Sequence, residues 1–266
     1  MVDKEKEVKN SEIPTKENIS KARTFHLKRL IFLVCLLVFI YSAYNLISIF
    51  LDYRAIDNMN QEIRDRYITT IEYEGSNLLN INWEDLIDRN SDVIGWIYLP
   101  GTNINYPVLQ GRDNDFYLRR DLDRNHSNAG SIFMEAQNNK LFTDLNTIIY
   151  GHNMRNNTKF ATINRIANER QELPEFIHIY LPNGILNIYQ VVSANRIDTS
   201  SRLYQRPLEN LEAYYQLMQE GRVKGREFNL EDVNHILTLS TCRGYGANTN
   251  RRSVIYAILI EEKDLN

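Results

Sequence analysis

One cysteine outside the N-terminal apolar segment is the residue best placed to carry chemistry in this chain. Cys242 ends the run Thr238-Leu239-Ser240-Thr241-Cys242, directly after an alternating apolar stretch. The second cysteine, Cys35, lies in an apolar segment near the N-terminus, so the remainder of the chain cannot form an internal disulfide. A lone thiol with a histidine available at the end of another strand is a candidate nucleophile. The alternative is a small buried apolar residue, which is the commoner role of a free cysteine.

Two arginines open the last predicted strand, where they could share a site with this thiol. Alternating patterns predict strands over 235–241 and 253–261, and Arg251 and Arg252 directly precede the second. If the strands pair antiparallel, Cys242 and the arginines lie at the same end of the sheet. Adjacent side chains of a strand point to opposite faces, so only one arginine can face the thiol. The alternative role for either is a solvated end group.

A histidine stands at the end of a third predicted strand. His152 follows Gly151 and the strand predicted over 147–150, a place where loops commonly display site residues. The alternative is a simple turn residue. No two histidines or carboxylates have the spacing of metal ligands, and no glycine-rich phosphate loop occurs, so the sequence predicts neither a metal site nor a cofactor. The other histidines are weaker candidates: His26, His126, His178 and His235.

An uncharged apolar stretch occupies residues 30–51, and basic residues precede it. As a helix it would span about 33 Å, against about 30 Å for the hydrocarbon core of a bilayer. The positive-inside rule then places the N-terminus in the cytoplasm and everything after residue 51 outside the cell. A cleavable signal peptide would have an apolar core of only roughly 7–15 residues and a small-residue cleavage site. The sequence therefore favours an uncleaved single-pass anchor in the cell membrane.

The composition, 43% hydrophobic and 24% charged with a formal net charge of −3, is ordinary for a globular protein. Nothing in it suggests a nucleic-acid partner. The chain divides into four predicted parts: a polar cytoplasmic tail over 1–29, the transmembrane anchor over 30–51, an N-terminal helical segment over 52–92 and a catalytic β domain over 93–266. Disorder is predicted over 1–28.

Helices and strands are predicted in clearly separated regions. Helical spacing of Ile56, Met59, Ile63 and Tyr67 follows the anchor, and Asn82 is a candidate N-cap of a second short helix. From residue 93 onward, short strands alternate with turns, and only two inserted helices interrupt them. Such a pattern argues for a closed or nearly closed β-barrel. The inserted helices are predicted over 158–170 and 208–218, and a hairpin is predicted over 176–192.

The residues around Cys242 resemble the signature of sortases, the membrane-anchored cysteine transpeptidases of Gram-positive bacteria. The run 238–242, the arginine ten residues after the cysteine and the pair Gly151-His152 carry this resemblance. It covers about residues 52–262 and implies a mainly β fold. The implied fold is a closed barrel of about eight strands with N-terminal helices and an inserted helix before the cysteine strand. Other parts resemble class B sortases in particular: 94–97, 106–108, 116–118, 127–133 and the helix over 208–218.

The resemblance also implies roles for individual residues. Cys242 would be the nucleophile, His152 would protonate the leaving amine and deprotonate the incoming one, and Arg252, which matches the family spacing, would bind the substrate carbonyl and oxyanion. The residues flanking the cysteine are candidates for substrate binding: Ser240, Thr241 and Arg243. In one departure, Arg243 and Gly244 replace the acidic residues that many class B members carry after the cysteine.

A sortase cuts the C-terminal sorting signal of a surface protein after a threonine, through a thioester. It then transfers the protein to an amine of a cell-wall precursor or a pilin. The resemblance therefore implies these partners, together with membrane lipid around the anchor. Two alternatives stay open at this point: a hydrolytic cysteine peptidase without an amine acceptor, and a non-enzymatic, membrane-anchored binding module.

Overall fold

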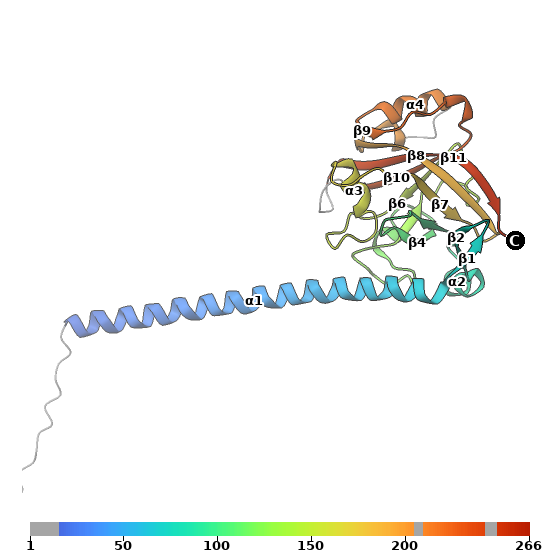
Figure 1. The fold of residues 1–266 in the computed structure, drawn as a ribbon. Helices are drawn as coiled ribbons and strands as arrows, with labels where there is room; N and C mark the ends of the chain where they lie inside the picture. The colour runs from blue at the N-terminus through green and yellow to red at the C-terminus, as the bar shows by residue number, and fades with distance from the viewer. Residues whose placement is uncertain (1–15, 205–209, 243–248) are drawn as a thin grey trace, which may run out of the picture. The chain divides into compact units, whose positions relative to one another are not determined.

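A computed structural model describes residues 16–204, 210–242 and 249–266, with side chains from Leu27 onward. Two compact units make up the chain, Met1–Ala55 and Ile56–Asn266. The long first helix, α1 (Lys16–Tyr67), crosses the boundary between them (Figure 1). Because α1 begins at Lys16, the prediction of disorder over 1–28 is wrong for residues 16–28. Helix growth needs only one costly nucleus, so a stable apolar helix can extend into a flanking polar segment.

The apolar part of α1 is a candidate membrane span by length and composition. Its apolar window has a mean hydropathy of 2.4 and contains no buried residue. Large apolar side chains such as Phe32, Phe39 and Phe50 are exposed, and so is Cys35. Exposed apolar side chains in a continuous run are stable in lipid, where the helix satisfies its own backbone groups. The N-terminal unit is therefore a candidate single-pass anchor.

The helical segment predicted over 52–92 is interrupted by a β-hairpin, so that prediction is wrong for residues 68–81. Strand β1 (Ile68–Tyr73) pairs antiparallel with β2 (Ser76–Ile81). Glu74 and Gly75, with φ of 49° and 75°, form the two-residue turn between them. Positive φ at both positions is the geometry that matches the twist of paired strands. The β-branched residues at the start of β1 also favour a strand over a helix.

The predicted helical features on either side of this hairpin are confirmed. Ile56, Ile63 and Tyr67 of α1 are buried at helical spacing. The second helix, α2 (Trp83–Arg89), begins after Asn82, whose side chain accepts a hydrogen bond of 3.3 Å from the Asp85 backbone N–H. This bond satisfies one of the free donors at the helix start.

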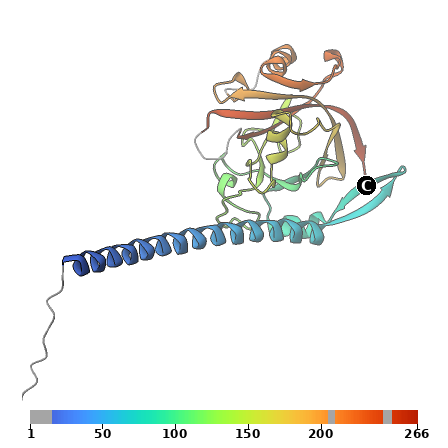
Figure 2. The ribbon, with the colours of Figure 1, turned by 60° about the vertical axis from the view of Figure 1, so that its left-hand side comes forward.

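A nine-stranded sheet closes on itself and forms the β-barrel that was predicted (Figures 1 and 2). Its order is β11-β10-β6-β5-β4-β3-β7-β8-β9, and β11 also pairs with β8, so eight strands, all but β9, form the closed ring. The pairs β4–β5 and β6–β10 are parallel, and the other pairs are antiparallel. The strands are β3 (Val93–Tyr98), β4 (Asn105–Leu109), β5 (Ile132–Met134), β6 (Asn146–Tyr150), β7 (Phe176–Tyr180), β8 (Ile185–Asp198), β9 (Arg222–Gly225), β10 (Ile236–Cys242) and β11 (Arg251–Asp264).

Closure of the ring depends on two long strands, β8 and β11, which lie side by side in Figure 1. Apolar residues from the surrounding strands fill the barrel interior, among them Ile97, Ile179 and Leu239, all fully buried. Around the ring lie the inserted helices α3 (Ala161–Ala167) and α4 (Leu211–Gln219), both shorter than predicted, and the 3-10 turns η1 (Tyr117–Arg119), η2 (Arg202–Tyr204) and η3 (Leu230–Asp232).

A chain that begins at Ile56 is expected to be soluble without detergent. Beyond Ala55 the large apolar side chains are mostly packed into three buried clusters, and the exposed run of apolar residues lies before this point. Centrifugation of lysate from cells expressing that truncated chain checks the prediction. Complete recovery in the membrane fraction would contradict a single anchor.

Candidate active site

Cys242 and Arg252 form the last cross-strand pair of the β10–β11 ladder, at the end where the chain connects the two strands. The antiparallel register places the Cα atom of Cys242 directly opposite that of Arg252. Directly opposed residues of an antiparallel pair project to the same face of the sheet, with Cβ atoms about 4.5–5.5 Å apart. The thiol and the guanidinium therefore share one face, as the predicted antiparallel pairing requires. Arg251 lies on the alternate face and is exposed.

His152 reaches the same end of the sheet from the other side of β10. Strand β6 runs parallel to β10, and their last paired residues are Tyr150 and Ser240. His152 and Cys242 each lie two residues beyond this pair, so continuation of the register places them side by side. Two hydrogen bonds continue the contact past the end of β6: the Gly151 N–H donates to the Ser240 carbonyl at 3.3 Å, and the Thr241 hydroxyl donates to the Gly151 carbonyl at 2.7 Å.

Gly151 is required here because no side chain fits. A Cβ atom on this residue would lie 2.5 Å from the Ile132 Cδ1 atom and 2.8 Å from the Phe160 ring. Both neighbours belong to the packed barrel interior. The backbone can therefore pass close to the core and present His152 immediately afterwards only when residue 151 lacks a side chain.

The imidazole of His152 is held by a backbone carbonyl. Its Nε2 atom lies 2.7 Å from the carbonyl oxygen of Leu118 in η1. A carbonyl oxygen can only accept, so Nε2 carries the proton and Nδ1 is the nitrogen left for proton transfer in the neutral ring. Gly130, with φ of 54°, passes so close to Leu118 that a Cβ atom would lie 2.5 Å from this carbonyl oxygen. The segments 116–118 and 127–133 thus support the histidine.

Burial lowers the pKa of His152 below its ordinary value. The hydrogen bond to Leu118 opposes this effect, whereas the positive charges of Lys159 and Arg119 add to it. A lowered pKa means that the ring stays neutral to lower pH than a free histidine. The neutral ring is the form that can accept a proton at Nδ1.

We expect the ring of His152 to titrate below the ordinary value of 6.5. A pH titration of the imidazole signals by NMR measures this directly, with His152→Gln to assign the signal. Titration above 6.5 would contradict the geometry, because it would require a carboxylate or an exposed ring in place of the buried contact with Leu118.

Two of the predicted substrate-binding residues, Ser240 and Thr241, form side-chain hydrogen bonds within the protein. The Ser240 hydroxyl lies 2.7 Å from the hydroxyl of Tyr204, and the Thr241 hydroxyl holds Gly151 as described above. Both residues are buried. These contacts hold β6, β10 and η2 together beneath the thiol, and direct contact with substrate stays a prediction. The third predicted residue, Arg243, lies outside the described residues.

A pocket of about 270 Å³ collects these side chains into one site. Its walls include Cys242, His152 and Arg252, so the structure brings together the three residues that the sequence singled out for catalysis. The Arg252 guanidinium donates to the carbonyls of Thr249 and Arg251. These bonds restrain the side chain beside the thiol and leave other N–H groups of its five for a ligand.

Sequence reasoning missed several residues of this pocket. Burial raises the pKa of Tyr204 to about 12, although its contact with Ser240 and the charge of Arg252 act in the opposite direction. Tyr204 is therefore a neutral hydroxyl at physiological pH, within electrostatic reach of both Cys242 and Arg252. It lies in a 3-10 turn that no sequence pattern marked. The other unpredicted lining residues are Asn114, Leu118, Phe133, Tyr150 and Thr199.

Comparison with known proteins identifies the family of this barrel and its site. A family model described as the sortase domain matches residues 97–260, which is more than half of the chain. The chain therefore belongs to the sortase family, and it is a cysteine transpeptidase rather than a binding module. The class is B. Sortase B of Staphylococcus aureus is 36% identical over 186 residues, covering 67% of this chain and 75% of the relative. Sortase B of Listeria monocytogenes is 31% identical over 193 residues, covering 71% of each chain.

Solved structures agree with this assignment. The X-ray structure of Clostridium perfringens sortase B has a TM-score of 0.58 and 34% identity, and the match covers 67% of this chain and 99% of that one. The crystal structure of S. aureus sortase B has a TM-score of 0.59 and 34% identity, covering 67% of this chain and 86% of that one. The closed mixed barrel with an N-terminal helix is thus the sortase B fold.

Proposed function

We propose that this enzyme cleaves the C-terminal sorting signal of surface proteins after a threonine and transfers the new carboxyl terminus to an amine. The acyl group passes through a thioester on Cys242. The acceptor is an amine of a cell-wall precursor or of a pilin. The observation that carries the proposal is the cross-strand pair of Cys242 and Arg252, next to the strand end that carries His152.

Each of the three residues has a distinct task in this reaction. The Cys242 thiolate attacks the carbonyl carbon of the threonine, and the carbonyl oxygen becomes an oxyanion. Arg252 stays protonated and so cannot act as a base, but its N–H groups can bind that oxyanion. His152 takes the thiol proton of Cys242 at Nδ1 and gives it to the leaving amine as the C–N bond breaks. It later takes a proton from the incoming amine, which attacks the thioester and displaces the Cys242 sulfur.

A hydrolytic cysteine peptidase would share the first half of this reaction, so the acceptor step distinguishes the two functions. The test incubates the enzyme with a panel of sorting-signal peptides, with and without a small primary amine such as a glycine peptide. Mass spectrometry then identifies the product. An amide whose yield rises with amine concentration supports the transpeptidase, whereas the free acid alone at every amine concentration contradicts it.

We also propose that the protein crosses the membrane once, with its N-terminus in the cytoplasm. In this topology residues 1–29 form the cytoplasmic tail, residues 30–51 cross the membrane, and the segments 52–92 and 93–266 lie outside the cell. The candidate span in α1 supports this proposal, as do the basic residues before it. Protease added to intact protoplasts should remove the barrel while sparing an N-terminal epitope tag.

A further inference from the structure

Glu135 holds two of the residues that form the wall of the catalytic pocket. It follows β5 directly and is half-buried. Its Oε1 atom accepts a hydrogen bond of 2.7 Å from the Asn114 side-chain amide, and its Oε2 atom accepts one of 2.9 Å from the Tyr150 hydroxyl. A longer contact of 3.5 Å joins Oε1 to the Gln137 N–H. Asn114 and Tyr150 line the pocket, so one carboxylate connects a wall residue of the β4–η1 loop with a wall residue of β6.

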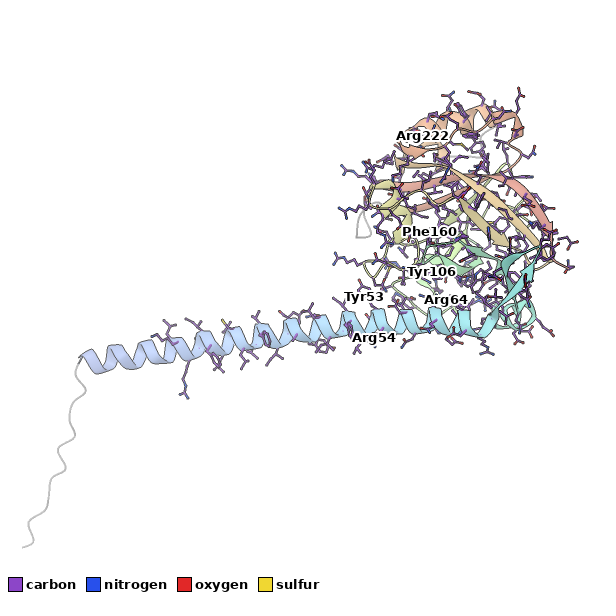
Figure 3. The ribbon with its side chains drawn as sticks, viewed as in Figure 1. Tyr53, Arg54, Arg64, Tyr106, Phe160 and Arg222 are labelled. Atoms are coloured by element: carbon purple, nitrogen blue, oxygen red, sulfur yellow. The ribbon has the colours of Figure 1, made fainter. Side chains whose placement is uncertain are left out.

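The main chain on both sides of this contact is fixed by the barrel. The Glu135 N–H donates to a carbonyl of β6 at 2.8 Å, and the Glu135 carbonyl accepts a hydrogen bond of 2.9 Å from the buried side chain of Gln110. Tyr150 ends β6 just before Gly151, where the chain passes close to the Phe160 ring in the barrel interior (Figure 3). The carboxylate and the hydroxyl therefore both project from main chain that the barrel holds in place.

The same contacts fix the orientation of the Asn114 amide. Its Nδ2 atom donates to Glu135, and its Oδ1 atom accepts a hydrogen bond of 2.8 Å from the Ala136 N–H. A carboxylate oxygen can only accept and a backbone N–H can only donate, so a flipped amide would lose both bonds. The second N–H of Nδ2 makes no hydrogen bond among the described residues, and it is the donor that Asn114 has left for a ligand.

Glu135 also determines the polarity of the Tyr150 hydroxyl. Burial raises the pKa of Tyr150 well above its ordinary value, the charge of Glu135 and the hydrogen bond to it add to this effect, and the charge of Arg252 acts in the opposite direction. The hydroxyl therefore keeps its single proton at physiological pH and donates it to Glu135. Toward any other group this oxygen can only accept. The wall thus offers a fixed donor at Asn114 and a fixed acceptor at Tyr150.

Such a wall suits a peptide, because each peptide group carries one N–H donor and one carbonyl acceptor. The Tyr150 ring also packs against Phe133, with 5.4 Å between the ring centres, and Phe133 lines the same pocket. The wall therefore combines apolar surface with a few polar groups in fixed positions, the usual composition of a site that orients its ligand.

We propose that Glu135 is a positioning residue for the sorting peptide: it orients the Asn114 N–H and the Tyr150 oxygen toward amide groups of the bound peptide. The inference rests on the proposed function, since it takes a sorting peptide as the ligand of this pocket. Glu135 is not among the residues that line the pocket, so it acts through these two neighbours and affects binding of the peptide more than the chemical step.

The first test measures binding without turnover. Full-length protein carrying Cys242→Ala, in micelles of a neutral detergent, is titrated calorimetrically with the sorting peptide that the wild type transfers best. Adding Glu135→Gln should weaken binding on the order of tenfold, because a glutamine can accept from only one of its two neighbours: the bond to Asn114 is lost, or the hydroxyl of Tyr150 is reversed. Adding Glu231→Gln, at an exposed glutamate of η3, is the matched control and should leave the affinity unchanged. Unchanged affinity in Glu135→Gln would overturn the inference.

A second variant separates positioning of the peptide from support of the fold. Glu135→Gln combined with Asn114→Asp restores both hydrogen bonds of residue 135, since the glutamine can donate to the new carboxylate and still accept from Tyr150. It removes the N–H that the wall offers to the peptide. We expect the Tm of this double variant to return to that of the parent while the affinity stays low. Recovery of the affinity together with the Tm would overturn the inference, because Glu135 would then only support the fold.

Kinetics with Cys242 intact complete the test. Glu135→Gln should raise KM for the peptide on the order of tenfold and leave kcat within about twofold of the wild type. A lower kcat with an unchanged KM would contradict a role in binding. Transfer by the wild type together with an unchanged KM in Glu135→Gln would overturn this inference alone. A wild type that forms no thioester with any peptide of the panel would overturn the proposed function, and the inference with it.

Discussion

Replacement of Cys242 by alanine is expected to reduce amine-dependent transfer to the uncatalysed background. The proposed thioester needs a sulfur at this position, and outside the candidate anchor the chain has no second cysteine. Removal of one sulfur from a half-buried side chain should cost little stability, because few packing contacts are lost. Mass spectrometry of the enzyme incubated with a sorting peptide, in the absence of amine, detects the covalent adduct in the wild type and should detect none in the variant.

Cys35→Ala provides the matched control, since it removes the only other thiol of the chain and leaves the barrel untouched. This variant should form the adduct and transfer peptide at the wild-type rate. An adduct that persists in Cys242→Ala, or one that disappears in Cys35→Ala, would require another nucleophile.

The second large effect is expected at the arginine opposite the thiol. Arg252→Lys should lower the rate of transfer by on the order of 10² to 10³, the usual effect of losing one oxyanion donor. Lysine keeps the charge but lacks the planar fork that could bind a carbonyl oxygen and an oxyanion while also holding the loop carbonyls. The rate is measured as amine-dependent transpeptidation of a peptide that the wild type accepts.

Arg251→Lys is the matched control, because Arg251 is the neighbour in sequence, carries the same charge and lies on the exposed face of β11. It should retain most of the wild-type rate, and circular dichroism should show both variants folded. A larger loss at Arg251 than at Arg252 would mean that the other face of β11 is presented to the substrate.

The barrel strands could be predicted from the sequence because their apolar patterns are short and clearly bounded. The hairpin over 68–81 could not, since it follows a strongly periodic helix without a break in polarity. Besides the β-branched residues at the start of β1, its signal was the pair Glu74-Gly75, and a glutamate in a left-handed turn is rarer than the asparagine or aspartate that usually marks such hairpins. Strand β9 has only four residues, too few for a period to be seen.

The grouping of the three proposed catalytic residues in one pocket could be predicted because Cys242, Arg252 and His152 each lie at or just after a strand end, where chain position indicates spatial position. Tyr204 and Leu118 reach the pocket from turns, and the contact of Leu118 is made by its backbone oxygen, which no side-chain pattern can indicate.

Cys242 and Arg252 are held opposite each other by strand pairing, so the segment that connects them can change in length. The seven residue pairs of the ladder, from Ile236–Ile258 to Cys242–Arg252, place these two residues opposite each other, and the number of residues in the connecting segment does not. Insertions or deletions between the two strands should therefore leave the cross-strand pair in place. A single deletion within β11 is different, because a shift of one residue turns every side chain beyond it to the opposite face. We therefore expect the proposed catalytic pair to tolerate changes in the length of the connecting segment but not a shift in the register of β11.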